Sequence, residues 1–393
     1  MFIQPSFKLM FSTCLVAAMG TAVLHGQDAT ATSSSTPVAY VFVSSAPAQG
    51  HPNVVHVYGI SESGQIEHVT GSPFPANDNV LAVAGGKLYG INQSRTDIDG
   101  YAIAADSALH AVGSTDYASY NPSGCGAAGW IFADRTGADL YAMNFDGDCS
   151  NNTMQSFRVQ ASGELTYLGS AEGGAGSFSG VYLPLTFVGD NKFGYEAVND
   201  NCMYYTTWAF QRTTNGDLVS INTSATMPPP PAGYNIYIPM FSAAAPSNYV
   251  AVAMEAAVPP GCSQGVPIQI GSFTADTQGN LSSTNTSTEM PDTAITSVED
   301  MKISPAGNLL AVGGTGGLQV FHFNGAHPPT HFTDVLTKDS VSQMFWDNAN
   351  HLYALSPSTG KLRIYTITAS SVTEAKGSPY AIANPLNIAV QSR

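Results

Sequence analysis

The sequence predicts an all-β protein folded as a seven-bladed β-propeller, and three observations lead to this fold class. The 393 residues include 38 glycines and 24 prolines, and they lack the long Ala/Glu/Lys/Leu runs of helical bundles and coiled coils. Short apolar or alternating segments recur between turn residues along the whole chain. The two ends of the chain carry complementary fragments of one such repeat.

The repeat is clearest in three segments. The first begins at Ala39 with Tyr-Val-Phe-Val, continues through strand-like runs at 54–58 and 65–69, and ends in Gly71-Ser72-Pro73-Phe74. A second unit begins at Met344 and ends in Gly377-Ser378-Pro379-Tyr380, and a third begins at Met301. Gly, Asn, Asp and Pro separate the runs, and no helical period is present. Four short strands per unit correspond to one propeller blade.

Seven inner strands are expected, one for each blade. Their predicted starts lie near Asn79, Gly129, Leu183, Asn235, Thr296, Val341 and Pro385. The last unit supplies a single strand, whereas the unit that begins at Val38 lacks an inner one. We therefore expect Leu386 to Val390 to pair with Tyr40 to Val43, which closes the ring and removes free sheet edges. Two β-sandwich domains are the alternative, but they explain neither the recurring Gly-Ser-Pro-aromatic ending nor the complementary fragments.

The N-terminus reads as a secretory signal. One lysine, Lys8, precedes an apolar run from Leu9 to Leu24, and polar residues follow. The expected organisation is a signal peptide over 1–27, a polar linker over 28–37 and the propeller over 38–393, with the mature chain soluble and secreted or periplasmic. A buried N-terminal helix or a membrane anchor is the alternative for the apolar run, which is shorter than a spanning helix requires.

Removal of such a signal, with Cys14, leaves four cysteines in an exported chain. An even number indicates two disulfides, for which spacing alone leaves three connectivities. The repeat layout places Cys125 and Cys149 on one face of the third blade, and Cys202 and Cys262 in equivalent loops of neighbouring blades. Because a disulfide tolerates only short Cα separations, we predict the pairs Cys125–Cys149 and Cys202–Cys262.

The charge balance limits the partners. The chain has 13 Lys+Arg against 28 Asp+Glu, a formal net charge of −15. Nucleic acids and anionic membranes require clustered basic residues, so both are excluded as partners. We expect a small-molecule or carbohydrate ligand or a protein partner, no membrane span in the mature chain, and a monomer.

The amino-acid sequence of the repeats resembles that of the bacterial lactonase family, the seven-bladed propellers related to 6-phosphogluconolactonase. The resemblance rests on 302–312 (Lys-Ile-Ser-Pro-Ala-Gly-Asn-Leu-Leu-Ala-Val), on 133–141 (Ala-Asp-Arg-Thr-Gly-Ala-Asp-Leu-Tyr) and on the two Gly-Ser-Pro-aromatic endings. It covers essentially the whole mature chain and implies the propeller fold, with hydrolysis of a sugar lactone as the activity. Active members carry a His-containing motif on an inner strand with Arg and Glu partners, and this sequence has no such His beside Gly129, Leu183 or Thr296.

One face of the ring receives the loops that surround the channel mouth, where a ligand site is expected. The polar residues placed there are His51, Arg95, Asp97, Asp116, Asp146, Asp148, Asp200, Glu255, Glu299 and Asp300. Our catalytic hypothesis is Glu299 as the base that activates water, with Arg95 and His51 as partners. Asp116, Asp200, Glu255 and Asp300 are the ligand-binding candidates.

Glu299 and Asp300 are adjacent on a predicted strand, so only one of them can point at the channel. The alternative for this pair is a carboxylate that satisfies backbone amides at a blade corner. For the whole protein, the alternative is a non-catalytic binding or interaction scaffold, since a propeller is a frame on which many functions occur.

Three further patterns are weaker. Gly261-Cys-Ser-Gln-Gly265 matches a nucleophile elbow, but the prolines on both sides prevent the helix that an elbow requires. His322, His327 and His331 have no cysteine or carboxylate at the spacing of a zinc site.

The segment Asp146-Gly-Asp148-Cys-Ser-Asn151-Asn152 alternates oxygen ligands, but Phe157 stands where a calcium loop has its bidentate Glu. A loose calcium site and simple Asx turns are both open for this segment. We expect no other cofactor.

Overall fold

The computed structural model describes residues 36–46, 51–104, 108–120, 128–144, 153–172, 181–182, 185–200, 204–221, 225–258 and 266–393. Residues 36–393 form one compact unit, and the expected signal peptide over 1–27 lies outside the described residues. The five cysteines, the Asp146–Asn152 segment and the Gly261–Gly265 pattern also lie outside them, so the disulfide and calcium predictions stay predictions.

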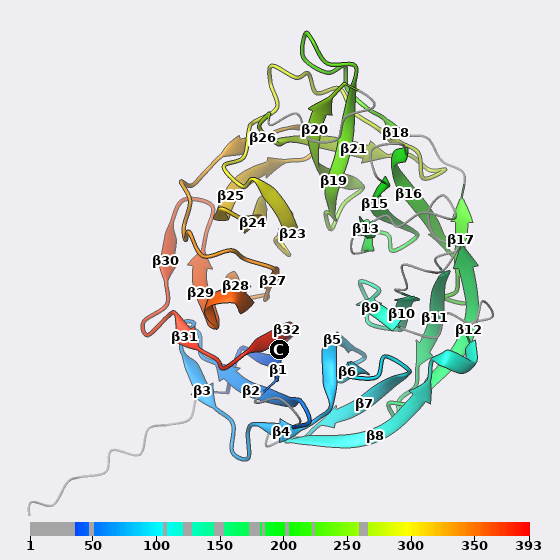
Figure 1. Ribbon diagram of the computed structural model, residues 1–393, viewed down its shortest axis with the longest axis vertical. Helices are drawn as coiled ribbons and strands as arrows, with labels where there is room; N and C mark the ends of the chain where they lie inside the picture. The colour runs from blue at the N-terminus through cyan, green and yellow to red at the C-terminus, as the bar shows by residue number, and fades with distance from the viewer. Residues whose placement is uncertain are drawn as a thin grey trace, which may run out of the picture. The chain divides into compact units, whose positions relative to one another are not determined.

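Seven small sheets, antiparallel except for one short parallel pair, are arranged around a common centre, which confirms the seven-bladed propeller (Figure 1). We number the blades from the N-terminus. Blades 1 to 3 contain, in order, β1 (Ala39–Ser45), β2 (Val54–Ile60), β3 (Ile66–His68), β4 (Phe74–Pro75) and β32 (Pro385–Ser392); β5 (Asp78–Ala84), β6 (Lys87–Asn92), β7 (Asp97–Ile103) and β8 (Leu109–Asp116); β9 (Ala128–Ala133), β10 (Asp139–Asn144), β11 (Thr153–Val159) and β12 (Leu165–Glu172).

Blades 4 to 7 follow the same plan, with an inner strand that is split in blade 4. Their strands are β13 (Val181–Tyr182), β14 (Thr186–Phe187), β15 (Phe193–Asp200), β16 (Tyr204–Arg212) and β17 (Leu218–Ile221); β18 (Ala225–Thr226), β19 (Ile236–Ala244), β20 (Tyr249–Ala257), β21 (Gln269–Ala275) and β22 (Leu281–Ser282); β23 (Ser297–Ile303), β24 (Leu309–Thr315), β25 (Gly317–Asn324) and β26 (His327–His331); β27 (Gln343–Trp346), β28 (His351–Ser356), β29 (Lys361–Ile367), β30 (Val372–Glu374) and β31 (Tyr380–Ala381).

The described ranges also contain two short 3-10 helices, η1 (Ala118–Tyr120) and η2 (Pro357–Thr359). No helix in the described part of the chain has the length and apolar character needed to cross a bilayer.

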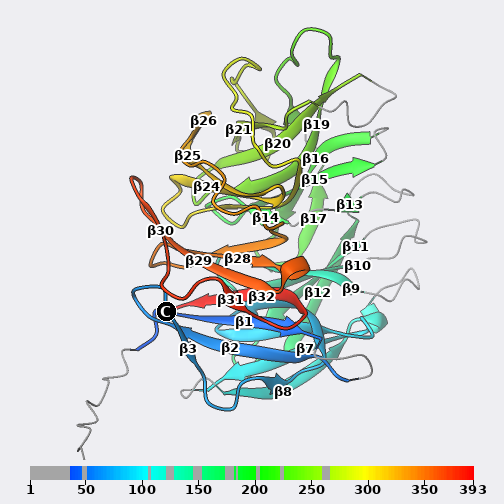
Figure 2. The ribbon, with the colours of Figure 1, turned by 60° about the vertical axis from the view of Figure 1, so that its left-hand side comes forward.

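The ring closes as predicted, between the two ends of the chain. The last strand, β32, pairs antiparallel with β1, with Val41 opposite Val390 and Val43 opposite Ile388. Both views show the two strands side by side (Figure 1, Figure 2). Ala389 is fully buried and Ile388 is almost fully buried. The C-terminal strand therefore supplies the inner strand that the N-terminal blade lacks.

The two Gly-Ser-Pro-aromatic endings have the same structural role in blades 1 and 7. Gly71 and Gly377 both have a positive φ, and a cis peptide bond joins each following serine to its proline. The Ser72 hydroxyl accepts a hydrogen bond from the backbone N–H of Val57 at 2.8 Å, and the Ser378 hydroxyl accepts one from Ile364 at 3.1 Å. The repeated sequence thus encodes a turn that returns the chain to the third strand of its own blade.

Neighbouring blades are joined by a repeated tyrosine contact. A tyrosine on the second strand of one blade donates its hydroxyl to a glycine carbonyl in the outer turn of the next blade. The pairs are Tyr89 with Gly163 at 2.9 Å, Tyr141 with Gly216 at 2.9 Å, and Tyr195 with Gly279 at 3.0 Å. All three tyrosines are fully buried, so each hydroxyl obtains the partner that a buried donor requires.

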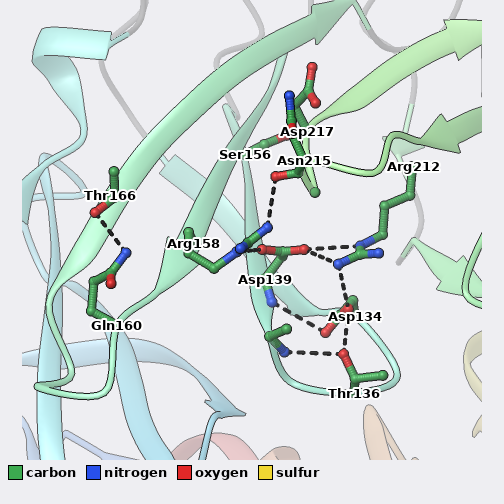
Figure 3. A network of polar contacts seen from close by, with 12 residues as sticks. Asp134, Thr136, Asp139, Ser156, Arg158, Gln160, Thr166, Arg212, Asn215 and Asp217 are labelled. Atoms are coloured by element: carbon green, nitrogen blue, oxygen red, sulfur yellow. Dashed lines mark hydrogen bonds and ion pairs between the residues drawn. The ribbon is translucent and has the colours of Figure 1, made fainter.

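A buried ion network ties blade 3 to blade 4 (Figure 3). Asp139, which is fully buried, accepts hydrogen bonds from Arg158 on its own blade and from Arg212 on blade 4. Arg212 also lies 3.4 Å from Asp134, whose Oδ2 accepts a hydrogen bond from Asn191 at 2.6 Å. Two guanidinium groups and a side-chain amide therefore compensate two buried carboxylates.

The turn beside this network requires a glycine. Gly216 has a φ of 88°, and a Cβ at this position would lie 2.3 Å from Asp139 Oδ2. A side chain would therefore displace the carboxylate from the two arginines, in addition to the strain of the left-handed backbone.

A second buried carboxylate, Asp78, begins the inner strand of blade 2. It is fully buried, its Oδ2 accepts a hydrogen bond from the Tyr101 hydroxyl at 2.7 Å, and its Oδ1 has no hydrogen-bond partner among the residues that the structure describes. The carboxylate fits because Gly90 on the paired strand has no side chain there. Burial raises the pKa of Asp78 to about 7, against the opposing effect of the Tyr101 hydrogen bond.

We predict that Asp78 makes the fold less stable as the pH rises. Because its pKa is raised in the folded state, its contribution is fully present below pH 4 and is lost as the pH rises through 7. Asp78→Asn should remove this part of the pH dependence and stabilise the protein at pH 8 by on the order of a few kcal/mol. Urea unfolding at pH 4.5 and pH 8 measures the difference, and identical pH profiles of wild type and variant would contradict it.

Candidate functional site

The inner strands line the centre of the ring and run in the same direction in every blade. We call the end at which they begin the upper end of the channel and the end at which they finish the lower end. The upper end receives the loops between second and third strands and the loops that lead into the next blade. Glu299 lies near the upper end, and Arg135 and Lys302 lie in the lower half.

Glu299 is an exposed carboxylate on an inner strand, near its upper end. The pairing of β23 with β24 shifts between Val298 and Asp300, so Glu299 occupies a β-bulge. Bulges re-aim side chains, and Glu299 is exposed while both of its neighbours are buried. Its Oε1 accepts hydrogen bonds from the hydroxyls of Thr315 at 3.4 Å and Ser340 at 3.3 Å.

Asp300, a predicted ligand-binding residue, instead joins blade 6 to blade 7. It is 4% exposed, and its Oδ2 accepts a hydrogen bond from the backbone N–H of Met344 at 2.6 Å. Its Oδ1 accepts from the backbone N–H of Met301 and from Lys302 Nζ, both at 2.9 Å. Burial raises the pKa of Asp300, and these contacts oppose that effect. The structure therefore supports the alternative that the sequence left open for this pair, a carboxylate that satisfies backbone amides.

The same type of contact recurs between other inner strands. Gln343 Oε1 accepts a hydrogen bond from the backbone N–H of Ile388 at 2.9 Å, which joins blade 7 to blade 1. Asn387 Oδ1 accepts one from Leu81 at 2.9 Å, which joins blade 1 to blade 2. A side-chain oxygen on one inner strand thus holds the next, and Asp300 is one example of this device.

The other two catalytic candidates lie on other blades. Arg95 is in the turn between β6 and β7 of blade 2, and the exposed His51 is in the connection between β1 and β2 of blade 1. Glu299 belongs to blade 6, and its described hydrogen bonds come from Thr315 and Ser340. A joint role of the three stays a prediction.

The remaining ligand-binding candidates are dispersed. Asp116 ends the outermost strand of blade 2, where it lines a cavity of about 330 Å³ together with Tyr120 and Glu164. Glu255 is 7% exposed on β20, and Asp200 ends β15. Their binding roles also stay predictions.

The three histidines of the suspected cluster are placed separately. His322 packs on the Phe332 ring at 4.4 Å between centroids, and His331 packs on the Phe321 ring at 5.1 Å. His327 is exposed at the start of β26. Within the described ranges, no three His, Cys, Asp or Glu side chains gather as a metal site would require.

The lower half of the channel contains a pocket that the sequence reasoning missed. Its volume is about 200 Å³, and its lining comes from blades 3 to 6. The polar side chains are Arg135, Thr186, Ser242 and Lys302. The sequence carries one partial signal, because strand alternation places Lys302 beside the Asp300 carboxylate, two residues earlier on the same inner strand. Arg135 and Ser242 had no such signal, because their proximity depends on blades far apart in sequence.

Searches of protein-family models and of curated proteins found no match to this sequence. Solved structures do match. A provisionally assigned 6-phosphogluconolactonase from Bacteroides fragilis shares 13% identity at a TM-score of 0.62, over 90% of this chain and 98% of that one. The periplasmic gluconolactonase of Pseudomonas aeruginosa shares 12% identity at a TM-score of 0.62, over 90% and 99%.

The similarity extends to a propeller with a different name. A hypothetical selenium-binding protein from Sulfolobus tokodaii shares 9% identity at a TM-score of 0.59, over 91% of this chain and 94% of that one. At such identities the comparisons show the fold alone. The chain is therefore a lactonase-like seven-bladed propeller in architecture, and its activity has to be argued from its own residues.

Proposed function

We propose that this protein binds a sugar lactone in its channel and hydrolyses it, with Glu299 as the group that activates water. The observation that carries the proposal is the exposed Glu299 carboxylate, which a β-bulge on an inner strand turns away from the buried positions on either side. The lactonase names of two propellers with the same fold support the substrate class.

The proposed hydrolysis requires one general base from the protein. A lactone is a cyclic ester, and attack of water on its carbonyl needs a base within hydrogen-bond reach of that water. The hydroxyls of Thr315 and Ser340 hold one Glu299 oxygen, so the other oxygen can accept the proton of an attacking water. The water oxygen bonds to the carbonyl carbon, the ring bond to the leaving oxygen breaks, and Glu299 returns the proton to that oxygen. The product is a hydroxy acid, and the Glu299 carboxylate is regenerated.

The test of this proposal is Glu299→Gln. The variant should lose at least about a hundredfold in kcat for hydrolysis of D-glucono-δ-lactone, the usual size of a lost general base. Its free energy of unfolding should change by less than about 1 kcal/mol, because the side chain is exposed. The assay follows acid release above the spontaneous rate, with Glu67→Gln on the outer strand of blade 1 as the matched control. An unchanged rate in Glu299→Gln would reject Glu299 as the base.

A second function, binding without catalysis, is favoured by the positions of the partner candidates. Arg95 and His51 belong to blades 2 and 1, and Asp300 is used between blades. If the wild-type protein hydrolyses no lactone, the proposal becomes a monomeric scaffold for a small molecule, a carbohydrate or a protein. Under either function we propose export, on the basis of the charged and apolar N-terminal segment.

A further inference from the structure

The pocket in the lower half of the channel differs in charge from the protein around it. Two cationic side chains, Arg135 and Lys302, line about 200 Å³, although the chain carries a formal net charge of −15. Only 13 of the 393 residues are Lys or Arg, so two in one small pocket concentrate a scarce residue type. A cationic lining inside an acidic protein indicates a ligand of negative charge.

Arg135 is held in place by backbone carbonyls and retains donors for a ligand. Its Nη1 donates to the carbonyl oxygens of Phe187 at 3.2 Å and Ala245 at 3.4 Å, and its backbone N–H donates to Asn191 at 3.1 Å. Within the described part of the chain, no carboxylate pairs with its guanidinium. The Nε and Nη2 groups therefore remain as donors in the planar arrangement that matches a carboxylate.

The two hydroxyls of the pocket are also donors. Ser242 is 2% exposed, and its hydroxyl has no hydrogen-bond partner among the described residues. The Thr186 hydroxyl accepts a hydrogen bond from the backbone N–H of Ala244 at 2.8 Å, so its own proton is left to donate. A buried hydroxyl without a partner is costly. The Ser242 hydroxyl oxygen has almost no exposed surface, so a small shift of its side chain would be needed for it to donate to a ligand oxygen in the pocket.

Lys302 adds a donor whose charge is already partly balanced. Its ammonium lies 2.9 Å from Asp300 and has two further protons. The pair contributes little net charge, so the pocket carries about one unbalanced positive charge, that of Arg135. This matches a monoanion better than a dianion.

We propose that this pocket is a carboxylate-binding site for a small hydroxy acid, in which Arg135, Ser242, Thr186 and Lys302 donate hydrogen bonds to the ligand. The lining offers N–H and O–H groups that suit an acceptor such as a carboxylate oxygen, and the small volume suits a short ligand. The proposal goes beyond the proposed function and holds whether or not Glu299 hydrolyses a lactone.

The test compares D-gluconate with D-glucitol, which carries an alcohol in place of the carboxylate. Isothermal titration calorimetry of the full-length protein should show saturable gluconate binding and glucitol binding at least tenfold weaker. Arg135→Gln should weaken gluconate binding by about 10- to 100-fold, the effect of a lost charge-assisted hydrogen bond. Ser242→Ala, which removes one neutral donor, should weaken it by about 2- to 10-fold.

Matched variants control for charge and folding. Lys87→Gln removes the same charge at the start of β6 in blade 2, where the ammonium contacts the Ala161 carbonyl, and should leave gluconate binding unchanged. If Arg135→Gln does not fold, Arg135→Lys replaces it, because it keeps the charge but loses the planar donor pair. The affinity of Arg135→Lys for gluconate should then lie between the affinity of the wild type for gluconate and its affinity for glucitol.

Three results would overturn the proposal. In the first, gluconate and glucitol bind with equal affinity, or neither binds. In the second, gluconate binds but neither the Arg135 variants nor Ser242→Ala weaken its binding. In the third, glucose 6-phosphate or inorganic phosphate binds more tightly than gluconate. The hydrolysis assay tests the catalytic role of Glu299 independently of this binding site. Gluconate binding without lactone hydrolysis keeps this site and rejects the catalytic role of Glu299, whereas hydrolysis without gluconate binding rejects only this site.

Discussion

Deletion of residues 385–393 is expected to abolish the cooperative unfolding of the propeller. This segment contains β32, which forms the inner strand of blade 1 and pairs with β1 along its length. Its loss uncovers the buried strand residues Val41 and Val43 and removes the inner strand that contacts blades 7 and 2. The loss in free energy of unfolding should be comparable with the whole stability of a domain, about 5–15 kcal/mol. Thermal unfolding followed by circular dichroism measures the effect.

The deletion also removes two contacts between blades. Ile388 donates its backbone N–H to Gln343 on blade 7, and Asn387 accepts from Leu81 on blade 2. A shorter deletion of Arg393 alone keeps both contacts and the pairing of β32, and should melt close to the full-length protein. A chain ending at Asn384 that melts like the full-length protein would show that the strand does not close the ring.

Asp139→Asn is expected to lower the free energy of unfolding by about 3 kcal/mol, at the lower end of the range for a broken buried ion pair. Asp139 is fully buried between Arg158 and Arg212, whose side chains are 37% and 18% exposed (Figure 3). The amide keeps the shape of the side chain but removes its charge. Of its two ion pairs in the described part of the chain, Arg212 then keeps the longer one, with Asp134, while the more exposed Arg158 regains water, which limits the loss.

Urea unfolding at pH 7 measures this change, with Glu67→Gln as an exposed carboxylate control that should shift stability by less than about 0.5 kcal/mol. Arg212→Gln should cost a similar amount to Asp139→Asn, and the double variant should cost less than the sum of the two single variants because both residues belong to one network. Additive effects would mean that the contact between blades 3 and 4 contributes nothing of its own.

Most of the fold could be predicted because it repeats. The predicted inner-strand starts near Asn79, Gly129 and Asn235 are each one residue from the observed starts at Asp78, Ala128 and Ile236. Turn residues and strand alternation are local properties, so they can be read from one sequence. The ring closure followed from two incomplete repeats. What the repeats did not encode is the split inner strand of blade 4, β13 and β14, and the parallel β18 in blade 5.

The site was less predictable because it depends on distances between blades. Strand alternation required the side chains of Glu299 and Asp300 to point to opposite sides, and Glu299 is exposed whereas Asp300 is buried. The bulge at Glu299 could not be read from the sequence. The contact of Asp300 with Met344 crosses between blades and has no sequence signal. The same is true of the pocket, where Arg135 and Ser242 come from blades 3 and 5.

The most direct test of a ligand-binding channel is a crystal structure of the protein with D-gluconate. We expect the ligand inside the channel, with its carboxylate within hydrogen-bond distance of Arg135 and Ser242 and its hydroxyls directed toward the end that carries Glu299. Gluconate bound only outside the channel, for example in the cavity beside Asp116 and Tyr120, would contradict it.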